Sequence, residues 1–176
     1  MPATRNLFFA IAPPPPVRAG LAREVERLHA AWGGRPTATA KLHMTLVFLD
    51  ALPAPLEAAV VMGARTAADD VRAAAFDLVV DRADRFGRRI GWLGCSQMPD
   101  ALQRLHDTLA AALVQRGVPM RQEPRYVPHV TALRDPKRPE PQAIAPLAWH
   151  VDGFTLMASA EGAYEVLGRW PLESDG

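Results

Sequence analysis

The sequence is almost free of cysteine: Cys95 is the single one, so no disulfide can form within the chain. This fits a protein of the reducing cytosol, because structural disulfides belong mainly to oxidising compartments. Long apolar runs are also missing, since the run at residues 7–12 is too short for a signal-peptide core or a membrane span. We therefore expect a soluble cytoplasmic protein that does not associate with a membrane.

The chain also has very little net charge. It contains 20 Lys and Arg against 19 Asp and Glu, a formal charge of +1. Such a balance creates no field that would hold long nucleic acid non-specifically, although a small polyanion or the end of an RNA is still a suitable ligand. With 176 residues the chain can bury a core unaided, and its length fits one domain or two small lobes that share a cleft.

Apolar periodicity and turn residues predict a mixture of helices and strands. One expected helix follows the prolines at 13–16, and two others occupy residues 55–70 and 100–116. The expected strands are 7–11, 75–80, 89–93, 149–158 and 162–170. Residues 81–88 read as a hairpin connection, and residues 136–146, with four prolines, read as a loop. The mixed order predicts an α+β class with largely antiparallel sheets.

Two further stretches, residues 41–49 and 126–134, carry the same pair of polar residues in apolar, strand-forming surroundings. The first contains His43 and Thr45, and the second contains His129 and Thr131. Side chains alternate between the two faces of a strand, so each His should share a face with its Thr. The residues between them should face the core: Leu42, Met44, Leu46, Phe48, Val130 and Ala132. The recurrence of such a strand in each half of the chain suggests an old duplication with a pseudo-two-fold axis.

Two such strands side by side would place two imidazoles and two hydroxyls in one cleft. Histidine titrates near neutrality, so one neutral ring can act as a base while one charged ring acts as an acid. Substitution at a phosphodiester suits this pair, and the threonine hydroxyls can hydrogen-bond the phosphoryl oxygens as charge develops. The chemistry needs no metal, and a zinc site is disfavoured because the chain has one Cys and no His-Glu-x-x-His motif.

The His-x-Thr pattern is weakly specific by itself, because a single histidine on a half-buried strand is more often a packed or surface residue. His106 and Thr108 fit the same pattern. They lie in a helical run, where residues two apart are separated by roughly 200° around the axis and cannot share a face. Strand context, and not the pattern, therefore selects His43 and His129.

Both strands resemble the paired HxTx motifs of the two-histidine (2H) phosphoesterases, among them the bacterial RNA 2′,3′-cyclic phosphodiesterases, also called 2′-5′ RNA ligase-like proteins. The resemblance extends nearly from end to end, through residues 7–11, 42–49, 89–94, 126–134 and 154–159 with Tyr164 and Trp170. It implies one bilobal α+β domain over residues 1–176. Two curved, mainly antiparallel sheets would line a central cleft, with helices outside.

The resemblance also implies an activity: hydrolysis of RNA 2′,3′-cyclic phosphate ends to 2′-phosphates without metal or cofactor, with a reversible 2′-5′ RNA ligase activity as an addition. By that similarity His43 donates a proton to the leaving 3′ oxygen and His129 activates water. Thr45 and Thr131 would hold the phosphate, and Arg134 would add positive charge. The expected partners are RNA ends or small nucleotides that bear the cyclic phosphate, and the protein is expected to be a monomer.

Several assignments stay open at this point. Strict alternation would turn Arg134 away from His129, so its role requires the strand to end or bulge near Leu133; otherwise it is a surface charge. Tyr126 and Trp92 could stack on a base, or they could be buried aromatics. A cluster of arginines could guide an RNA end or simply lie on a solvated hairpin: Arg82, Arg85, Arg88 and Arg89.

Two positions depart from the family pattern. Ala132 stands where leucine is common, which should alter core packing and not chemistry. Asp50 stands where glycine is usual, so we expect a changed turn there.

Two alternative functions remain beside RNA hydrolysis: a phosphodiesterase for small cyclic nucleotides, and a non-catalytic protein that binds RNA ends or nucleotides.

Overall fold

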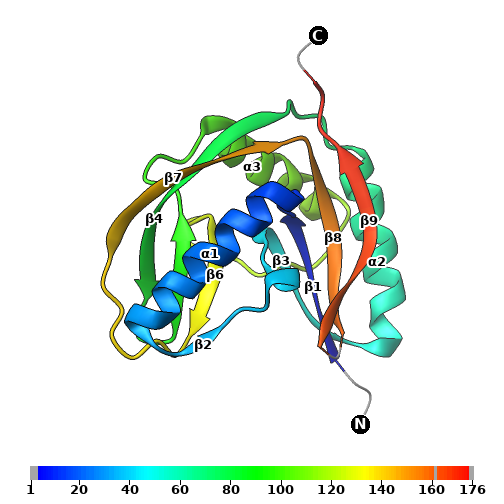
Figure 1. Ribbon diagram of the computed structural model, residues 1–176. Helices are drawn as coiled ribbons and strands as arrows, with labels where there is room; N and C mark the ends of the chain where they lie inside the picture. Colours follow the sequence, from blue (N-terminus) through cyan, green and yellow to red (C-terminus); the bar gives the residue numbers. More distant parts are fainter. Residues whose placement is uncertain (1–3, 161, 175–176) are drawn as a thin grey trace.

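The computed structural model describes residues 4–160 and 162–174. Within them, three helices lie outside a strongly curved sheet (Figure 1). The elements are β1 Thr4–Ile11, α1 Pro15–Trp32, β2 Arg35–Pro36, a 3-10 turn Thr39–Lys41, β3 Met44–Pro53, α2 Ala54–Asp69, β4 Phe76–Phe86, β5 Ile90–Gly94, α3 Asp100–Gln115, β6 His129–Arg134, β7 Gln142–Val151, β8 Gly153–Ala160 and β9 Ala163–Pro171. The predicted α+β class is confirmed. The prediction of one domain over residues 1–176 extends to residues outside those described.

The nine strands form one sheet in the order β7-β4-β5-β6-β3-β1-β8-β9, with β2 paired to β6. Its neighbouring strands are antiparallel. The join between β3 and β6 consists of one residue pair, Met44 opposite Val130. Four strands lie on each side of this join: β3, β1, β8 and β9, which we call the His43 half, and β6, β5, β4 and β7, the His129 half. The two predicted sheets are thus two halves of one continuous sheet.

The two halves repeat one unit of chain. Both β1–α1–β3 and β5–α3–β6 run from a strand through a helix to a strand that begins at a motif histidine, as β6 does, or directly after one, as β3 does. Each unit is extended outward by two more strands, so the order reads the same from the join in either direction. Met44 and Val130 each directly follow a motif histidine, and they face each other where a two-fold axis would pass. The topology therefore has the predicted pseudo-two-fold arrangement.

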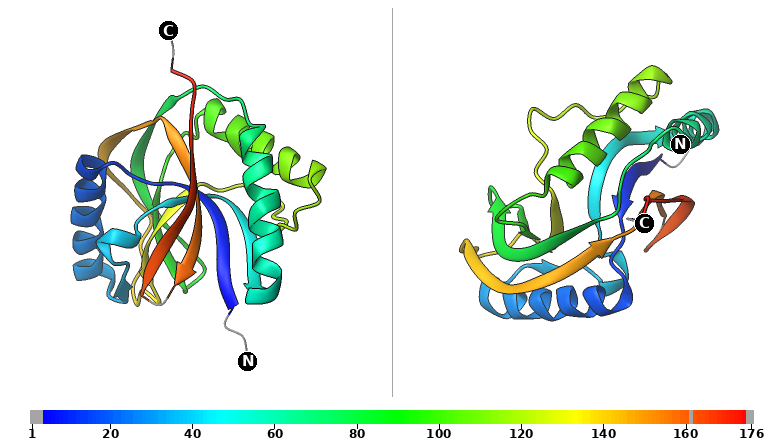
Figure 2. Two further views of the ribbon diagram at one scale, coloured as in Figure 1. Left: turned by 90° about the vertical axis from the view of Figure 1, so that its right-hand side faces the viewer. Right: turned by 90° about the horizontal axis from the view of Figure 1, so that it is seen from above.

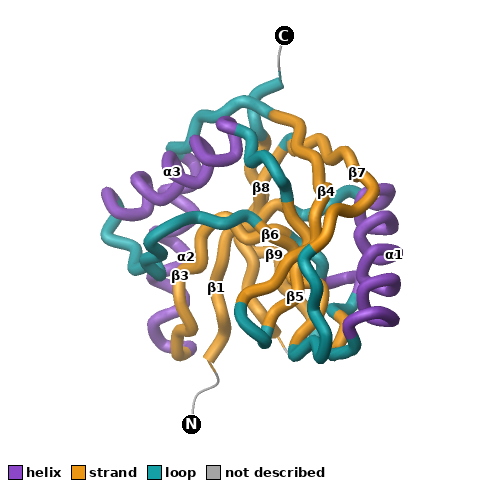
Figure 3. The backbone as a smooth tube through the Cα atoms, turned by 90° about the vertical axis from the view of Figure 1, so that its left-hand side faces the viewer, coloured by secondary structure: helices purple, strands orange, loops and turns teal. Residues whose placement is uncertain are grey.

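The helices are exchanged between the halves. Helix α1 connects strands of the His43 half but lies against β6 and β7, whereas α3 connects strands of the His129 half but lies against β3 (Figure 2, right). The tube view also shows α1 and α3 on opposite sides of the strands (Figure 3). The covering face of α3 is fully buried, as its helical spacing of leucines requires: Leu102, Leu105, Leu109 and Leu113. Each half is therefore covered by a helix from the other repeat.

Two segments predicted as connections are strands. Strand β4 continues to Phe86, and the turn occupies only residues 87–89. Strand β7 begins at Gln142, inside the predicted proline loop. Its register with β4 shifts between Val80 and Arg82, and Pro146 lies in that irregular stretch, where no ladder hydrogen bond is required of it. The predicted strand 149–158 is also wrong, because residues 149–151 end β7 and β8 starts at Gly153.

The two motif strands begin later than predicted. Strand β3 starts at Met44, directly after His43, and β6 starts at His129. A 3-10 turn occupies residues 39–41, which precede the first motif. The turn expected at Asp50 is absent from this segment, because β3 continues through the exposed Asp50 to Pro53. Both histidines therefore stand at the beginning of a strand, where the chain enters the sheet.

A glycine controls how α1 connects to β2. Gly34 has a positive φ angle of +87°, and a Cβ atom at this position would lie 2.7 Å from the carbonyl oxygen of Arg134. We predict that Gly34→Ala lowers the free energy of unfolding by about 3 kcal/mol, because backbone strain and a clash add together. Gly117→Ala is the matched control, since Gly117 also has positive φ, +67, but open space around its Cβ position. Urea unfolding should show a clearly smaller loss for the control; equal losses would contradict the clash.

Candidate active site

The two motif histidines are held in the same way. The Nδ1 atom of His43 lies 2.8 Å from the carbonyl oxygen of Lys41, and that of His129 lies 2.8 Å from the carbonyl oxygen of Val127. A carbonyl oxygen can only accept, so Nδ1 carries a proton in both rings. The Nε2 atom of each ring is therefore the one left to exchange a proton with a ligand.

The motif side chains surround one cleft. His43, Thr45 and Thr131 line a cavity of about 490 Å³. Thr45 also lines a second hollow together with His129, and His129 and Thr131 line a third. Within the His43 motif, Nε2 of the ring lies 3.1 Å from the hydroxyl of Thr45. Because the three hollows share these residues, the structure brings together both histidines and both threonines.

Aromatic side chains pack against both imidazoles. Phe8 of β1 stacks on His43 with ring centroids 4.9 Å apart, and Tyr164 of β9 meets the same ring edge-on at 5.2 Å. On the other side, two rings contact His129: Phe86 and Trp92. These contacts limit rotation of the imidazoles and remove water from their faces, so the orientation of both rings is largely set by the protein itself.

Burial lowers the pKa of both imidazoles, because a charged ring is poorly solvated in this cleft. The hydrogen bonds to Lys41 and Val127 partly offset this lowering. The neighbouring charges differ between the rings: His129 and Arg18 lower the pKa of His43 further, whereas Glu123 raises that of His129. The neighbouring charges thus disfavour the charged form of His43 and favour that of His129.

A β-bulge follows each motif threonine. The extra residue is Leu46 in β3 and Ala132 in β6, because neither has a partner in the register with β1 or β5. A bulge shifts the alternation of side chains by one residue. As a result, the second residue after each bulge, Phe48 in β3 and Arg134 in β6, lines the 490 Å³ cavity. The role predicted for Arg134 required the strand to end or bulge near Leu133, and the bulge meets this condition. The core position predicted for Phe48 is wrong, whereas Ala132 is fully buried as predicted.

Tyr126 lies behind the cleft. Its hydroxyl donates to the carbonyl oxygen of Thr45 at 2.9 Å, and burial raises the pKa of that hydroxyl. Its ring stacks on His106 at 4.1 Å, and His106 Nδ1 donates to the carbonyl oxygen of Leu46 at 2.8 Å. Both side chains therefore support the backbone at the first bulge. This geometry favours the structural alternative for Tyr126, and its contact with substrate stays a prediction.

The arginines of the β4–β5 hairpin lie outside the 490 Å³ cavity. Arg82 is paired with Asp84 and covers the ring of Trp92 at 5.5 Å. Arg85 donates to the carbonyl oxygen of Gly87. These contacts favour the solvated-hairpin interpretation, and Trp92, which is 5% exposed, is a packed aromatic and offers no stacking platform.

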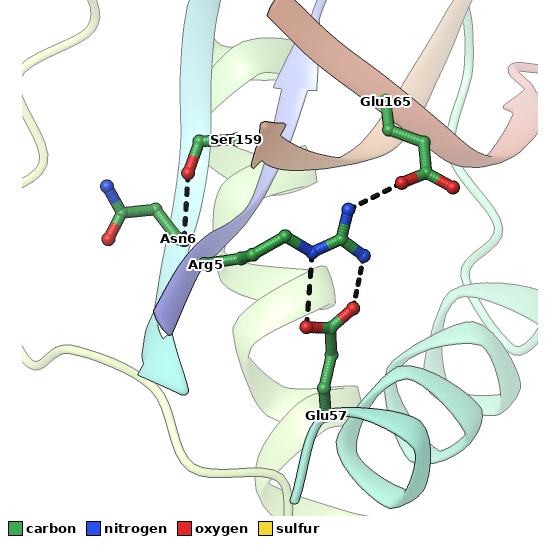
Figure 4. A network of polar contacts seen from close by, with 5 residues as sticks. All are labelled: Arg5, Asn6, Glu57, Ser159 and Glu165. Carbon is green, nitrogen blue, oxygen red and sulfur yellow. Dashed lines mark hydrogen bonds and ion pairs between the residues drawn. The ribbon is translucent and has the colours of Figure 1, made fainter. Parts of the chain in front are cut away.

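Two arginines that the sequence patterns did not identify support the cleft. Arg18 of α1 donates to the carbonyl oxygens of Thr39 and Leu42 at 2.7 and 3.2 Å and thereby holds the segment before His43. Arg5 of β1 is bound by two carboxylates from distant elements (Figure 4): Glu57 of α2 and Glu165 of β9. Glu165 is adjacent to Tyr164, so this network fixes the strand that places Tyr164 on His43. No local motif signals such contacts, because the partners are far apart in the sequence.

A hydrogen bond from backbone to side chain beside this network is also visible in Figure 4: the backbone N–H of Asn6 donates to the hydroxyl of Ser159 at 2.9 Å. It joins β1 to β8 at the far end of the 490 Å³ cavity, which both residues line. The Arg5 side chain lies on one side of β1 and the Asn6 side chain on the other. The cavity wall is therefore braced from behind by ion pairs.

Comparison with known proteins identifies the family. The model of the 2′-5′ RNA ligase superfamily matches residues 13–163. The chain belongs to this superfamily. An RNA 2′,3′-cyclic phosphodiesterase from Escherichia coli (strain K12) is 34% identical over 181 residues, which cover 98% of this chain and 99% of that protein.

Solved structures of the superfamily agree with the fold. E. coli LigT complexed with 3′-AMP superposes with a TM-score of 0.78 at 32% identity, over 96% of this chain and 98% of that one. The protein TT0787 of Thermus thermophilus has a TM-score of 0.75 at 23% identity, over 97% and 100%, and supports the fold alone. The predicted family and bilobal fold are confirmed.

Among residues 4–160 and 162–174, no group of three or more His, Cys, Asp or Glu side chains is placed to hold a metal ion. No helix in that part of this 2′-5′ RNA ligase superfamily member is long and apolar enough to span a membrane.

The electrostatics of the cleft predict how its histidines titrate. By NMR, both rings should titrate below the ordinary histidine value of about 6.5, because burial disfavours the charged form. Their contribution to stability is then complete above that value and is lost as the pH falls through the folded pKa. Glu123→Gln should lower the pKa of His129 further, since it removes a negative neighbour. Glu26→Gln, an exposed change on α1, should leave it unmoved; equal effects would refute the assignment to Glu123.

Proposed function

We propose that this member of the superfamily hydrolyses RNA 2′,3′-cyclic phosphate ends to 2′-phosphomonoesters. One observation carries the proposal: two imidazoles line the same group of hollows, and in each ring Nδ1 is held by a backbone carbonyl, so that Nε2 is left to exchange a proton with a ligand. The identity of 34% to an RNA 2′,3′-cyclic phosphodiesterase supports the choice of substrate. The expected partners are RNA ends or nucleotides that carry the cyclic phosphate.

In the proposed reaction the cyclic phosphate lies between the two rings. Neutral His129 removes a proton from water through Nε2, and the water oxygen bonds to phosphorus. The bond from phosphorus to the 3′ oxygen breaks, and charged His43 gives its Nε2 proton to that oxygen. Thr45 and Thr131 donate hydrogen bonds to the phosphoryl oxygens, and Arg134 adds positive charge. The product keeps its phosphate on the 2′ oxygen.

The choice of His43 as donor rests on shape as well as on family resemblance. The ribose carries the leaving oxygen and so lies on the donor side, and the larger cavity of about 490 Å³ is beside His43. The charges around the empty cleft instead favour the proton on His129. With His43 as donor, the proton must therefore reside on His43 in the reactive complex. The negative phosphate makes a charged ring less costly there than in the empty cleft.

A reversible 2′-5′ RNA ligase activity is the second candidate. If a 5′ hydroxyl replaces water, His129 takes its proton and the same displacement leaves phosphorus bound to the 2′ and 5′ oxygens. A hollow of about 380 Å³ beside His129, lined by Phe86 and Ile90, offers room for more than a water molecule. Phe86 is 37% exposed, so a base could stack there.

Two alternatives share the cleft: a phosphodiesterase for small cyclic nucleotides, and a binder without turnover. Assays on an oligonucleotide with a cyclic-phosphate end and on the corresponding mononucleotide separate these possibilities. An RNA phosphodiesterase turns over the oligonucleotide, a phosphodiesterase for small nucleotides turns over the mononucleotide alone, and a non-catalytic protein only binds.

We further propose that the protein acts as a monomer in the cytoplasm. Sedimentation measures the first property and cell fractionation the second.

We predict that His43→Ala and His129→Ala each lower kcat by about 10²- to 10⁴-fold on a cyclic-phosphate oligonucleotide, because each removes an acid or base. The double variant should lose much less than the product of the two, since the pair acts as a unit. His29→Ala, an exposed change on α1, is the control for loss of any histidine. Product analysis should find the 2′-phosphate, and wild-type activity in a folded His129→Ala variant would refute the mechanism.

The two roles can be separated with a substrate whose 3′ bridging oxygen is replaced by sulfur. A thiolate leaves without needing a proton, so His43→Ala should recover most of its lost rate on this substrate, and His129→Ala should not. Recovery in His129→Ala alone would reverse the assignment of acid and base, while the two-histidine site itself would stand.

We also predict that hydrolysis persists in excess EDTA. The imidazoles supply both proton transfers, and two hydroxyls and Arg134 supply the phosphate contacts, so the mechanism assigns no step to a metal ion. Initial rates with and without EDTA should agree. A loss that added Mg²⁺ or Mn²⁺ restores would show that the proposed chemistry is incomplete.

A further inference from the structure

The 490 Å³ cavity beside His43 is lined by three cations. They are Arg35, Lys41 and Arg134, and no carboxylate is among the described residues that line it. Arg134 already has a place in the proposed reaction, but Lys41 and Arg35 have none. Cations that line a ligand cavity without opposing carboxylates favour anionic ligand groups.

Lys41 is fixed close to the catalytic ring. Its carbonyl oxygen accepts the Nδ1 proton of His43, so the two residues cannot move independently. Its Nζ atom lies 5.6 Å from the ring centroid of Tyr164, and Tyr164 in turn packs edge-on against His43. Arg134 also acts on this group, since its charge lowers the pKa of the Tyr164 hydroxyl against the effect of burial. Two cations therefore converge on Tyr164.

Arg35 lies further out, at the mouth of the cavity. It stands on β2, opposite Arg134 in the register with β6. Its side chain is 72% exposed and is paired at 2.7 Å with Asp135, which is itself 60% exposed. An exposed pair of this kind contributes little and is easily replaced by a stronger anion. The cations thus extend from Lys41, beside Tyr164, to the exposed Arg35 opposite Arg134.

We propose that Lys41 binds the 5′-phosphate of the nucleotide that carries the cyclic phosphate, and that Arg35 binds the next phosphate of the chain. This subsite rests on the proposed function. If His43 is the donor, the ribose lies in this cavity, and its 5′ oxygen is where the preceding phosphate is attached. The hollow beside His129 is less suited, because Arg125 shares its lining with Glu123.

The test compares two mononucleotides that differ in one group: a nucleoside 2′,3′-cyclic phosphate and the same compound with a 5′-phosphate. In the wild type the 5′-phosphate should raise kcat/KM about fivefold, the upper range for a partly exposed charge pair. Lys41→Ala should bring the ratio of the two kcat/KM values close to one, and Lys41→Arg should restore it. Because both substrates are measured on the same variant, general damage to the cleft lowers both kcat/KM values and leaves their ratio unchanged.

Arg65→Ala is the matched control, because it removes one exposed cation from α2, outside the cavity lining. It should leave the ratio unchanged, which separates the effect of a local contact from the effect of net charge.

The outer contact is tested with a trinucleotide that ends in a cyclic phosphate. Arg35→Ala should make the slope of log(kcat/KM) against log[salt] less steep by about 0.7, which is the slope per phosphate of a single strand.

A wild-type ratio of one, or a ratio that survives Lys41→Ala, would overturn the Lys41 assignment while hydrolysis itself stands. An unchanged salt slope in Arg35→Ala would overturn the outer contact. If the wild type turned over none of these substrates, the proposed function would fail instead. Calorimetry with the two mononucleotides would then decide about Lys41 alone: loss of the preference for the 5′-phosphate in Lys41→Ala supports the subsite, and its persistence refutes it.

Discussion

The active cleft depends on one backbone pairing, Met44 opposite Val130, which joins the two halves of the sheet. Each paired residue follows a motif histidine, so the main chain determines how far apart the imidazoles stand. The exchange of helices strengthens this join, because α1 and α3 each cover the half to which their flanking strands do not belong. The positions of the two motif histidines thus depend on the one residue pair that joins the halves of the sheet.

The alternation of side chains predicted which residues of the two motifs share a face, and the family resemblance predicted the layers. Neither predicted the bulges at Leu46 and Ala132, because a bulge is a property of the register with β1 and β5 and not of the bulged strand itself. For the same reason Phe48 was placed in the core. The loop predicted around Pro146 is wrong for a related reason. A proline is excluded from a regular ladder position, but β7 accommodates Pro146 where the register of β7 with β4 shifts.

The frame is nearly symmetric, but the chemistry on it is not. At the second position after each bulge, one half carries Phe48 and the other Arg134, so only one of these two positions brings positive charge to the cavity. Arg18 acts on His43, whereas Glu123 acts on His129. An acid–base pair requires such a difference, because two identical imidazoles in identical surroundings would share no preference for which ring holds the proton. These differences come from elements distant in sequence, which local patterns do not contain.

The division of the sheet also has a consequence for the order in which the protein is made. The strands of the His129 half, β4 to β7, are contiguous in the chain, whereas β1 of the His43 half pairs both with β3 and with β8, which follows the whole His129 half in the chain. Contacts between such distant segments form slowly, since the intervening chain must first be ordered. The wall that holds His43, with Tyr164 on β9, is therefore complete only after β8 and β9 have been made. A nascent chain contains both motif histidines before that wall has formed.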